Sequence, residues 1–155
     1  MVSVQMRVFN GGNYLAEAVE SILNQTFQDF EFLVLDDGST DDSLAILRQY
    51  AHKDSRIRVI SRENRGLGVT QHESVQHTRG EFIAQLDQDD IALQDRLELQ
   101  VDFLRKNPKV VAVGGASQLI DSAGRYLTTL MRPQTDAEYR HLIWMGTVQL
   151  LIPAS

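Results

Sequence analysis

The feature that most constrains this chain is a regular alternation of short apolar runs with longer segments of helical period. The run at 30–35 is nearly continuously apolar, which is typical of a strand buried on both faces of a sheet. The segments between such runs place apolar residues three or four positions apart, as at Leu15, Val19 and Ile22, and this spacing predicts amphipathic helices. Strands alternating with helices favour a mostly parallel sheet with helices on both faces, a Rossmann-like three-layer α/β/α fold.

Turn and capping residues indicate where the elements begin and end. Strands are expected at 2–8, 30–35, 57–60, 81–86, 110–113 and 148–152. Helices are expected at about 14–25, from a cap formed by Ser39 and Asp42 to about 50, from 66 to about 79, from about 94 to 107, and from 135 to 144. Residues 118–120 and 126–128 flank a turn and are expected to form a hairpin.

We expect one domain over residues 1–155, because no segment rich in proline, glycine or serine divides the chain. The length is sufficient to bury a core without disulfides. The last expected strand, 148–152, stops close to the final residue, so we expect a C-terminally truncated fold that forms the first part of a longer protein. A second copy of the chain is one way to cover that strand, which makes a homodimer a further expectation.

Composition excludes several classes of function. The chain has no cysteine, which rules out disulfides, thiolate metal sites and catalytic thiols. Its net charge of −6 argues against a nucleic-acid partner, since binding a phosphate backbone requires a positive surface, whereas a single nucleotide can bind through a bridging divalent cation. The sequence shows neither an apolar run as long as a membrane span nor an N-terminal signal. A cytoplasmic location is therefore expected, with attachment to the inner face of the membrane left open.

Acidic residues follow two of the expected strands. Asp36 and Asp37 come at the end of the second strand, and the run Asp87-Gln88-Asp89-Asp90 comes after the fourth. Ligands of open α/β sheets bind at the carboxyl ends of the strands, where these loops and the Asn10-Gly11-Gly12 turn after the first strand are expected to converge. The sequence therefore predicts a ligand-binding crevice at this edge of the sheet.

The spacing of Asp87 and Asp89 predicts a divalent metal site. In an extended segment, residues two apart point to the same side, and two carboxylates there suit Mg²⁺ or Mn²⁺, which leave positions open for diphosphate oxygens. Such a cation would link an acidic protein to an acidic ligand and would neutralise charge on a departing nucleoside diphosphate. The alternative is a chance Asp-x-Asp whose carboxylates cap a helix or are solvated.

The segment Asp36-Asp37-Gly38-Ser39 admits two interpretations. One is a tight turn followed by a helix cap. The other is a carboxylate that accepts hydrogen bonds from a base N–H or a ribose hydroxyl, as acidic residues at strand ends do in dinucleotide folds. Arg62 and Arg65 come later in the sequence and could contact phosphate, although a solvated surface arginine is the simpler interpretation.

An ordered series of short motifs runs along nearly the whole chain. These are Val2-Ser3-Val4, Phe9-Asn10-Gly11, and the segments 21–27, 36–41, 63–66, 79–84, 87–90 and 95–97. In this order and spacing they resemble the N-terminal, nucleotide-sugar-binding part of family-2 glycosyltransferases, which are inverting enzymes of the GT-A fold. Several motifs in register make the resemblance far more specific than any one of them.

The resemblance implies roles for individual residues. Phe9 takes the place of an aromatic residue beside the nucleotide base, and Asp37 would contact that base. Asp87 would lie on the ribose side, and Asp89 would bind the metal and the diphosphate. With Arg65, these are the expected nucleotide-sugar-binding residues, and Asp89 and Asp87 are the expected metal ligands.

The implied reaction transfers a sugar from a nucleoside-diphosphate sugar, first of all a UDP-sugar, to a saccharide or lipid-linked acceptor. The anomeric carbon is inverted by one in-line displacement in which a carboxylate base deprotonates the acceptor hydroxyl. In the family that base lies in a later acidic motif, so the catalytic base is expected beyond residue 155. The implied cofactor is Mn²⁺ or Mg²⁺.

The chain also departs from the family pattern. The departures are at Gln5, Arg7, Phe9, His72, Ser74 and Gln94. A non-catalytic nucleotide-binding remnant that lacks the acceptor-side base therefore remains an alternative. A phosphoacceptor switch fits less well, because it needs an aspartate at the end of the third strand, where Ser61-Arg62 stands. A nucleotidyltransferase would need a basic, glycine-rich first loop, and the turn at 10–13 has no lysine or arginine.

Overall fold

The structure is a computed structural model that describes residues 1–131 and the main chain of residues 151–153. Its elements are β1 (Val2–Val8), α1 (Leu15–Leu23), β2 (Phe30–Asp36), α2 (Ser43–Lys53), β3 (Ile57–Ser61), α3 (Leu67–Gln76), β4 (Phe82–Gln85), α4 (Arg96–Lys106), β5 (Ser117–Ile120), β6 (Tyr126–Leu130) and β7 (Leu151–Pro153). The main sheet has the strand order β3-β2-β1-β4-β7. Strands β1 to β4 are parallel and β7 is antiparallel to β4, which confirms the expected mostly parallel sheet.

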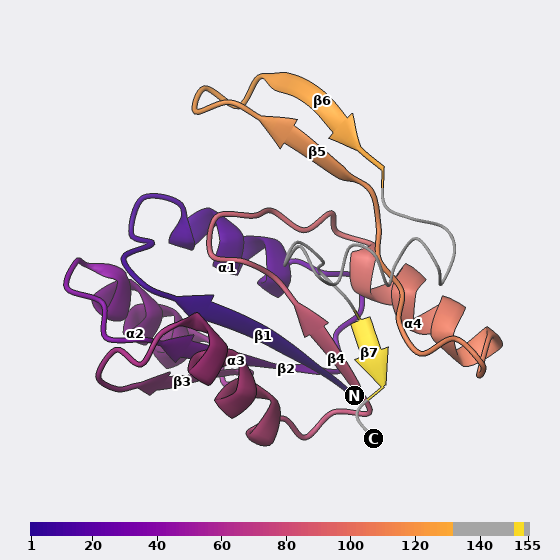
Figure 1. Cartoon of the computed structure of the whole chain (residues 1–155), viewed down its shortest axis with the longest axis horizontal. Coiled ribbons are helices and arrows are strands. Elements are labelled where there is room, and N and C mark those ends of the chain that lie inside the picture. Colours follow the sequence, from indigo (N-terminus) through magenta and orange to yellow (C-terminus); the bar gives the residue numbers. More distant parts are fainter. Residues whose placement is uncertain (132–150, 154–155) are drawn as a thin grey trace.

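The central strand β1 divides the two faces of the sheet by the alternation of its side chains. Its even-numbered residues are buried in the main core, where they pack with apolar residues of α1, α2 and α4. Its odd-numbered residues Ser3, Gln5 and Arg7 face the opposite side, where the Ser74 hydroxyl of α3 lies 3.0 Å from Gln5 Oε1. Helices therefore cover both faces, and the expected three layers are confirmed (Figure 1).

The neighbouring strand β2 is buried on both of its faces. Residues 32–35 are at most 1% exposed, so odd-numbered and even-numbered side chains alike are packed. Burying each such side chain stabilises the fold by roughly 1.5–3 kcal/mol. This rigid strand carries two carboxylates to the carboxyl edge of the sheet, because Asp36 is its last residue and Asp37 follows directly.

The strand expected at 110–113 is wrong. The segment is irregular, and Val113 makes only an isolated bridge, although Val110 and Val113 both pack against the core. Val111 is 75% exposed, so the apolar run is a partly buried loop, which periodicity alone does not separate from a short strand. The described helices begin and end within a few residues of the expected positions, and the helix expected at 135–144 lies outside the described residues. No helix in the described part of the chain is long and apolar enough to cross a lipid bilayer.

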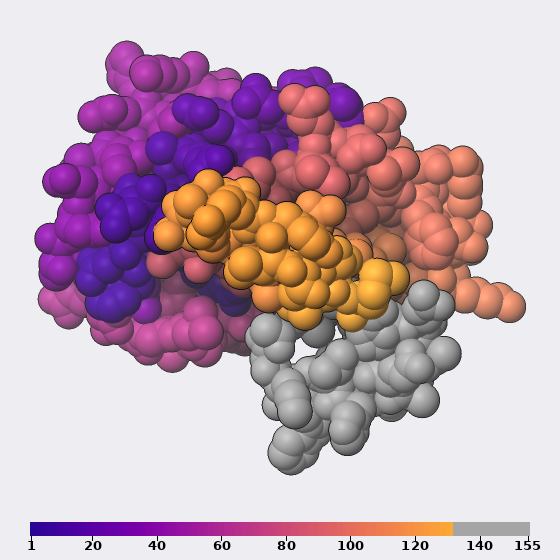
Figure 2. Space-filling model, turned by 90° about the horizontal axis from the view of Figure 1, so that it is seen from above, coloured from indigo at the N-terminus to yellow at the C-terminus, as the bar shows by residue number. Residues whose placement is uncertain are grey.

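The expected hairpin is confirmed as β5 and β6, which form a separate two-stranded antiparallel sheet. It stands apart from the main sheet in Figure 1. Seen from above, it crosses in front of the N-terminal and central segments of the chain (orange, Figure 2). Its side chains are largely exposed, including Tyr126 at 59% and Leu127 at 61%.

Candidate functional site

The loops after β1 and β2 are tied together at the carboxyl edge of the sheet, as the sequence predicts. The main-chain N–H of Asn10 donates to Ser39 Oγ at 3.0 Å, and the N–H of Thr40 donates to Asn10 Oδ1 at 2.8 Å. Asn10 has a φ of 53°, a left-handed conformation in which asparagine is enriched. The Gly12 N–H adds a third bond, to Asp41 Oδ2 at 3.0 Å.

The helix cap expected from Ser39 and Asp42 is wrong. Ser39 Oγ already accepts the Asn10 N–H, and α2 begins later, at Ser43, without a side-chain bond from Asp42. The N–H of Ser43 instead donates to Asp41 Oδ1 at 3.0 Å. The polar residues before α2 therefore hold two loops together, a contact between distant parts of the chain that a local capping pattern does not reveal.

Gln88, the middle residue of the acidic motif, fastens the third loop to the first. Its Oε1 accepts the Phe9 N–H at 2.9 Å, and its Nε2 donates to the Phe9 carbonyl at 3.2 Å. A methyl group at Gly11 would lie 2.5 Å from Gln88 Oε1, so the missing side chain of Gly11 makes room for this contact. Phe9 is 47% exposed at the end of β1. The aromatic residue expected beside the base and the acidic motif are thus adjacent.

The acidic motif forms a turn, in which the Asp90 N–H donates to the Asp87 carbonyl at 3.2 Å. The extended shape assumed for it is therefore wrong, and two-residue alternation does not describe Asp87 and Asp89. Both residues are exposed at the sheet edge, and carboxylate oxygens are ligands that Mg²⁺ and Mn²⁺ accept. No cluster of three or more acidic, histidine or cysteine side chains suited to a metal occurs within residues 1–131. A cation bound by these carboxylates would need further oxygens from the ligand and water.

Arg7 forms an ion pair with Asp87, with Nη2 2.9 Å from Oδ1. Strands β1 and β4 are parallel with Gln5 opposite Gln85, and the same offset brings Arg7 opposite Asp87 just beyond the end of β4. The side chain of Arg7 is 16% exposed and that of Asp87 is 51% exposed. The arginine is therefore the fixed partner of the pair, and the aspartate is the accessible one.

A second arginine, Arg96 at the start of α4, lies close to the acidic motif. Its Nη2 donates to the Gln85 carbonyl at 2.8 Å. Burial lowers the pKa of its guanidinium, and the negative charges of Asp90 and Asp87 offset part of that effect. The sequence reasoning gave neither Arg7 nor Arg96 a role, because the strand register that brings Arg7 to Asp87 is a property of the folded sheet.

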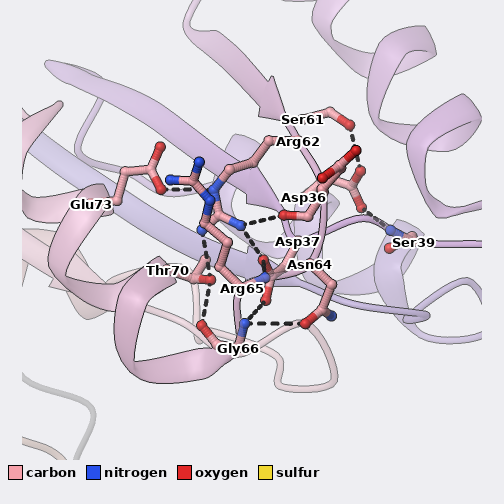
Figure 3. Close-up of polar contacts among 11 residues, drawn as sticks. Asp36, Asp37, Ser39, Ser61, Arg62, Asn64, Arg65, Gly66, Thr70 and Glu73 are labelled. Carbon is pink, nitrogen blue, oxygen red and sulfur yellow. Dashed lines mark hydrogen bonds and ion pairs between the residues drawn. The ribbon is translucent and has the colours of Figure 1, made fainter.

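Asp37 is 5% exposed and is held by groups of its own chain (Figure 3). Its Oδ1 accepts the Arg65 N–H at 2.9 Å, its Oδ2 accepts the Gly66 N–H at 3.0 Å, and it forms an ion pair with Arg62. Burial alone would raise the pKa of this carboxyl, but the hydrogen bonds from Arg65 and Arg62 and the charge of Arg62 hold the pKa below its ordinary value. Asp37 is therefore ionised at neutral pH.

Arg62 connects Asp37 to α3. Its Nε donates to Glu73 Oε2 at 2.7 Å, and its Nη2 donates to Thr70 Oγ1 at 2.9 Å (Figure 3). Because its side chain is only 15% exposed, the interpretation of Arg62 as a solvated surface residue is wrong. Arg65 is exposed, and its bond to Asp37 is made by its main-chain N–H and not by its guanidinium.

Asp36 has a structural role at the same edge. It is 1% exposed, its Oδ2 accepts the Ser61 hydroxyl at 2.7 Å, and its Oδ1 accepts the Ser39 N–H at 3.2 Å. The turn interpretation therefore holds for Asp36. Asp37 lies beside the first loop, because its N–H donates to the Val8 carbonyl at 2.8 Å.

The chain is similar to known proteins over most of its length. The chain matches the family model described as "Glycosyl transferase family 2" over residues 3–147. It is 38% identical over 128 residues to a chondroitin synthase of Escherichia coli, a match that covers 83% of this chain and 19% of that protein. It is 39% identical over 125 residues to the putative glycosyltransferase EpsE of Bacillus subtilis, covering 79% and 45%. The chain thus spans less than half the length of these curated relatives.

Solved structures show the same fold. TarS 1–349 of S. aureus in complex with UDP-GlcNAc matches with a TM-score of 0.80 at 22% identity, over 99% of this chain and 45% of that one. The mannosyltransferase PcManGT from Pyrobaculum calidifontis, in complex with GDP-Man and Mn²⁺, matches with a TM-score of 0.68 at 25% identity, over 74% and 34%. The expected GT-A fold is confirmed, and with the family match over residues 3–147 the chain belongs to glycosyl transferase family 2.

Proposed function

We propose that this chain is the nucleotide-sugar-binding part of a metal-dependent, inverting glycosyltransferase. The observation that carries the proposal is the Gln88 contact, which holds the main chain of the exposed residue Phe9 beside the acidic motif. The ionised Asp37 lies at the end of the adjacent strand. A nucleoside diphosphate requires an aromatic or apolar surface for its base, hydrogen-bond acceptors for base and ribose, and a cation for its phosphates. In support, TarS was solved with UDP-GlcNAc and PcManGT with GDP-Man and Mn²⁺.

The base would lie against Phe9 and meet Asp37. A base–aromatic contact contributes roughly 1–3 kcal/mol and tolerates any base, so it does not choose among nucleotides. Asp37 is ionised, and an ionised carboxylate only accepts hydrogen bonds. It therefore fits a base edge that presents an N–H, as the imide of uracil does, and the N–H groups of thymine and guanine fit the same acceptor. The donor that we propose is a UDP-sugar, as in the TarS complex with UDP-GlcNAc, and the titration compares UDP with GDP and dTDP.

The ribose and diphosphate would lie along the acidic motif. Asp87 has one oxygen paired with Arg7, and its second oxygen is the proposed acceptor for a ribose hydroxyl. Asp89 is the proposed carboxylate ligand of Mn²⁺ or Mg²⁺, with Asp87 beside it, and Arg65 would approach the phosphates from the loop after β3. The bound cation would supply Lewis-acid stabilisation of the leaving diphosphate. The acceptor, a saccharide or lipid-linked sugar, would be deprotonated by a base beyond residue 155.

The test is calorimetric titration of UDP, GDP and dTDP into the chain with and without Mn²⁺. The variants are Asp89→Ala and the control Asp102→Ala, which removes an exposed carboxylate of α4 that pairs with Lys106. We expect Mn²⁺-dependent UDP binding that Asp89→Ala abolishes and Asp102→Ala leaves intact. Absence of nucleotide binding by the folded wild-type chain would overturn the proposal.

The alternative function, a nucleotide-binding remnant without transfer, predicts the same binding but a different turnover. A full-length relative or extended chain should release UDP from a UDP-sugar when a suitable acceptor is present. Binding of donor and metal without UDP release from any acceptor tested would favour the remnant.

A further inference from the structure

Arg7 is the residue in the site whose position the proposed function does not yet explain. It projects from the central strand onto the same side of the sheet as Gln5, and its side chain is 16% exposed. It is paired with Asp87, a proposed ligand residue, at 2.9 Å. A cation that approaches Asp87 therefore meets an oxygen that is already paired with the Arg7 guanidinium. That guanidinium cannot be deprotonated, so its positive charge is always present.

The charges around the acidic motif nearly cancel before any ligand binds. Asp87, Asp89 and Asp90 contribute three negative charges, and Arg7 and Arg96 contribute two positive charges, which leaves a net charge of minus one. The two arginines have the same sign of charge as a divalent cation, and like charges repel strongly at short distances, even at a protein surface. A free divalent cation is therefore attracted weakly, and a nucleoside diphosphate must add its own negative charge and oxygens.

Arg7 cannot move away with ease. It belongs to the buried β1, which is paired with β2 along its whole length, so its backbone is fixed. Asp87 follows the last residue of β4 and is 51% exposed, so it is the partner that can turn toward a ligand. The Arg7 side chain therefore remains attached at the carboxyl edge of the sheet, next to the acidic motif, when Asp87 turns.

We propose that Arg7 is a positioning residue that makes metal binding depend on the nucleotide: it reserves Asp87 and repels a free divalent cation, so that the cation is bound together with the diphosphate. This inference rests on the proposed function of the same site. By linkage, a nucleotide that tightens metal binding is itself tightened by metal to the same factor.

The test is a titration of Mn²⁺ into the chain, followed by the electron paramagnetic resonance signal of free Mn²⁺, without nucleotide and with UDP. The variants are Arg7→Gln, which removes the charge, and Arg7→Lys, which keeps it. The matched control is Arg105→Gln, because Arg105 pairs with Glu81 at 3.0 Å, just before β4 and so at the opposite end of that strand.

We expect Arg7→Gln to bind Mn²⁺ without nucleotide roughly tenfold more tightly than the wild type, from the loss of one nearby unit charge. Arg7→Lys and Arg105→Gln should bind as the wild type does. UDP should tighten Mn²⁺ binding by a smaller factor in Arg7→Gln than in the wild type. The advantage of Arg7→Gln should shrink as salt is raised, because salt screens charges at the surface.

An unchanged or weakened affinity of Arg7→Gln for Mn²⁺ would overturn the inference. If that variant does not fold, the wild type decides, since equal Mn²⁺ affinity with and without UDP would also overturn it. The failures of the two proposals are distinguishable. Nucleotide-coupled Mn²⁺ binding that Arg7→Gln leaves unchanged would overturn this inference and leave the proposed function standing. No UDP binding by any variant would overturn the proposed function, and the coupling to nucleotide with it, even if Arg7→Gln bound Mn²⁺ more tightly.

Discussion

Gln88 is paired with the main chain of Phe9 through both ends of its side-chain amide, at 2.9 Å and 3.2 Å. Gln88, the residue between Asp87 and Asp89, thus provides the hydrogen bonds that a neighbouring strand would provide, beyond the last pairing of β4 with β1. Any change that breaks this contact should loosen both the aromatic residue and the carboxylates of the site.

Gln88→Ala should lower the free energy of unfolding by roughly 1–2 kcal/mol, because two hydrogen bonds to the main chain are lost. It should also weaken UDP binding. Gly11→Ala should lower the free energy of unfolding by a similar amount, since its methyl group would displace the Gln88 amide. Urea unfolding of both single variants and the double variant forms a cycle. We expect Gly11→Ala to cost little in the Gln88→Ala background, and fully additive effects would contradict this assignment.

Gly80 is a position where a side chain has no room. A methyl group there would lie 2.8 Å from the carbonyl carbon of Val2 and closer still to the Ser3 nitrogen, both atoms of the central strand. Gly80→Ala should therefore destabilise the fold by about 1–3 kcal/mol, the usual cost of overpacking. Gly68→Ala is the matched control, since its methyl group meets no atom within 4 Å and it lies within α3. Thermal unfolding should show Gly68→Ala as stable as the wild type or more so.

Asp37 should make the stability of the fold depend on pH in the acid range. Its pKa is held below the ordinary value in the folded chain, so unfolded chains bind the proton more readily. The stabilisation is complete above the ordinary aspartate pKa of about 3.9 and is lost as the pH falls through the lower folded pKa. Urea unfolding between pH of about 5 and about 3 should show a shallower pH dependence for Asp37→Asn than for the wild type. Parallel curves for the two proteins would show that folding does not lower the pKa of Asp37.

Gln5 is a buried polar residue whose hydrogen bonds are incomplete. It is 3% exposed, and its Nε2 has no partner within the described chain. The Ser74 hydroxyl near its Oε1 also lies 2.8 Å from the Gln71 carbonyl, and one hydroxyl proton cannot serve both. Ser74→Ala should cost about 1 kcal/mol, whereas Gln5→Leu with Ser74→Ala should be neutral or stabilising. Chemical denaturation of these two variants and the wild type checks this, and a double variant less stable than Ser74→Ala would contradict it.

Much of this protein was determined by local patterns in its sequence. Apolar periodicity placed the strands from β1 to β4 and the helices between them, because burial on one or two faces repeats at the period of the element. The acidic residues after β2 and β4 could be assigned to one edge, because parallel strands bring their carboxyl ends together. The ordered motifs indicated the family, which the match over residues 3–147 confirms. The same local reasoning failed at 110–113, where the apolar run forms an irregular, partly buried segment with a single bridge at Val113.

The tertiary structure alone decided which side chains became partners. Arg7 and Asp87 are 80 positions apart, and Phe9 and Gln88 are 79 apart, so no local pattern links either pair. Strand register and loop packing bring them within hydrogen-bond distance. The Arg62 side chain is likewise only 15% exposed, because it forms ion pairs with both Asp37 and Glu73. Periodicity reports which way a residue faces, whereas a hydrogen bond depends on a distance between two residues, and only the folded sheet sets that distance.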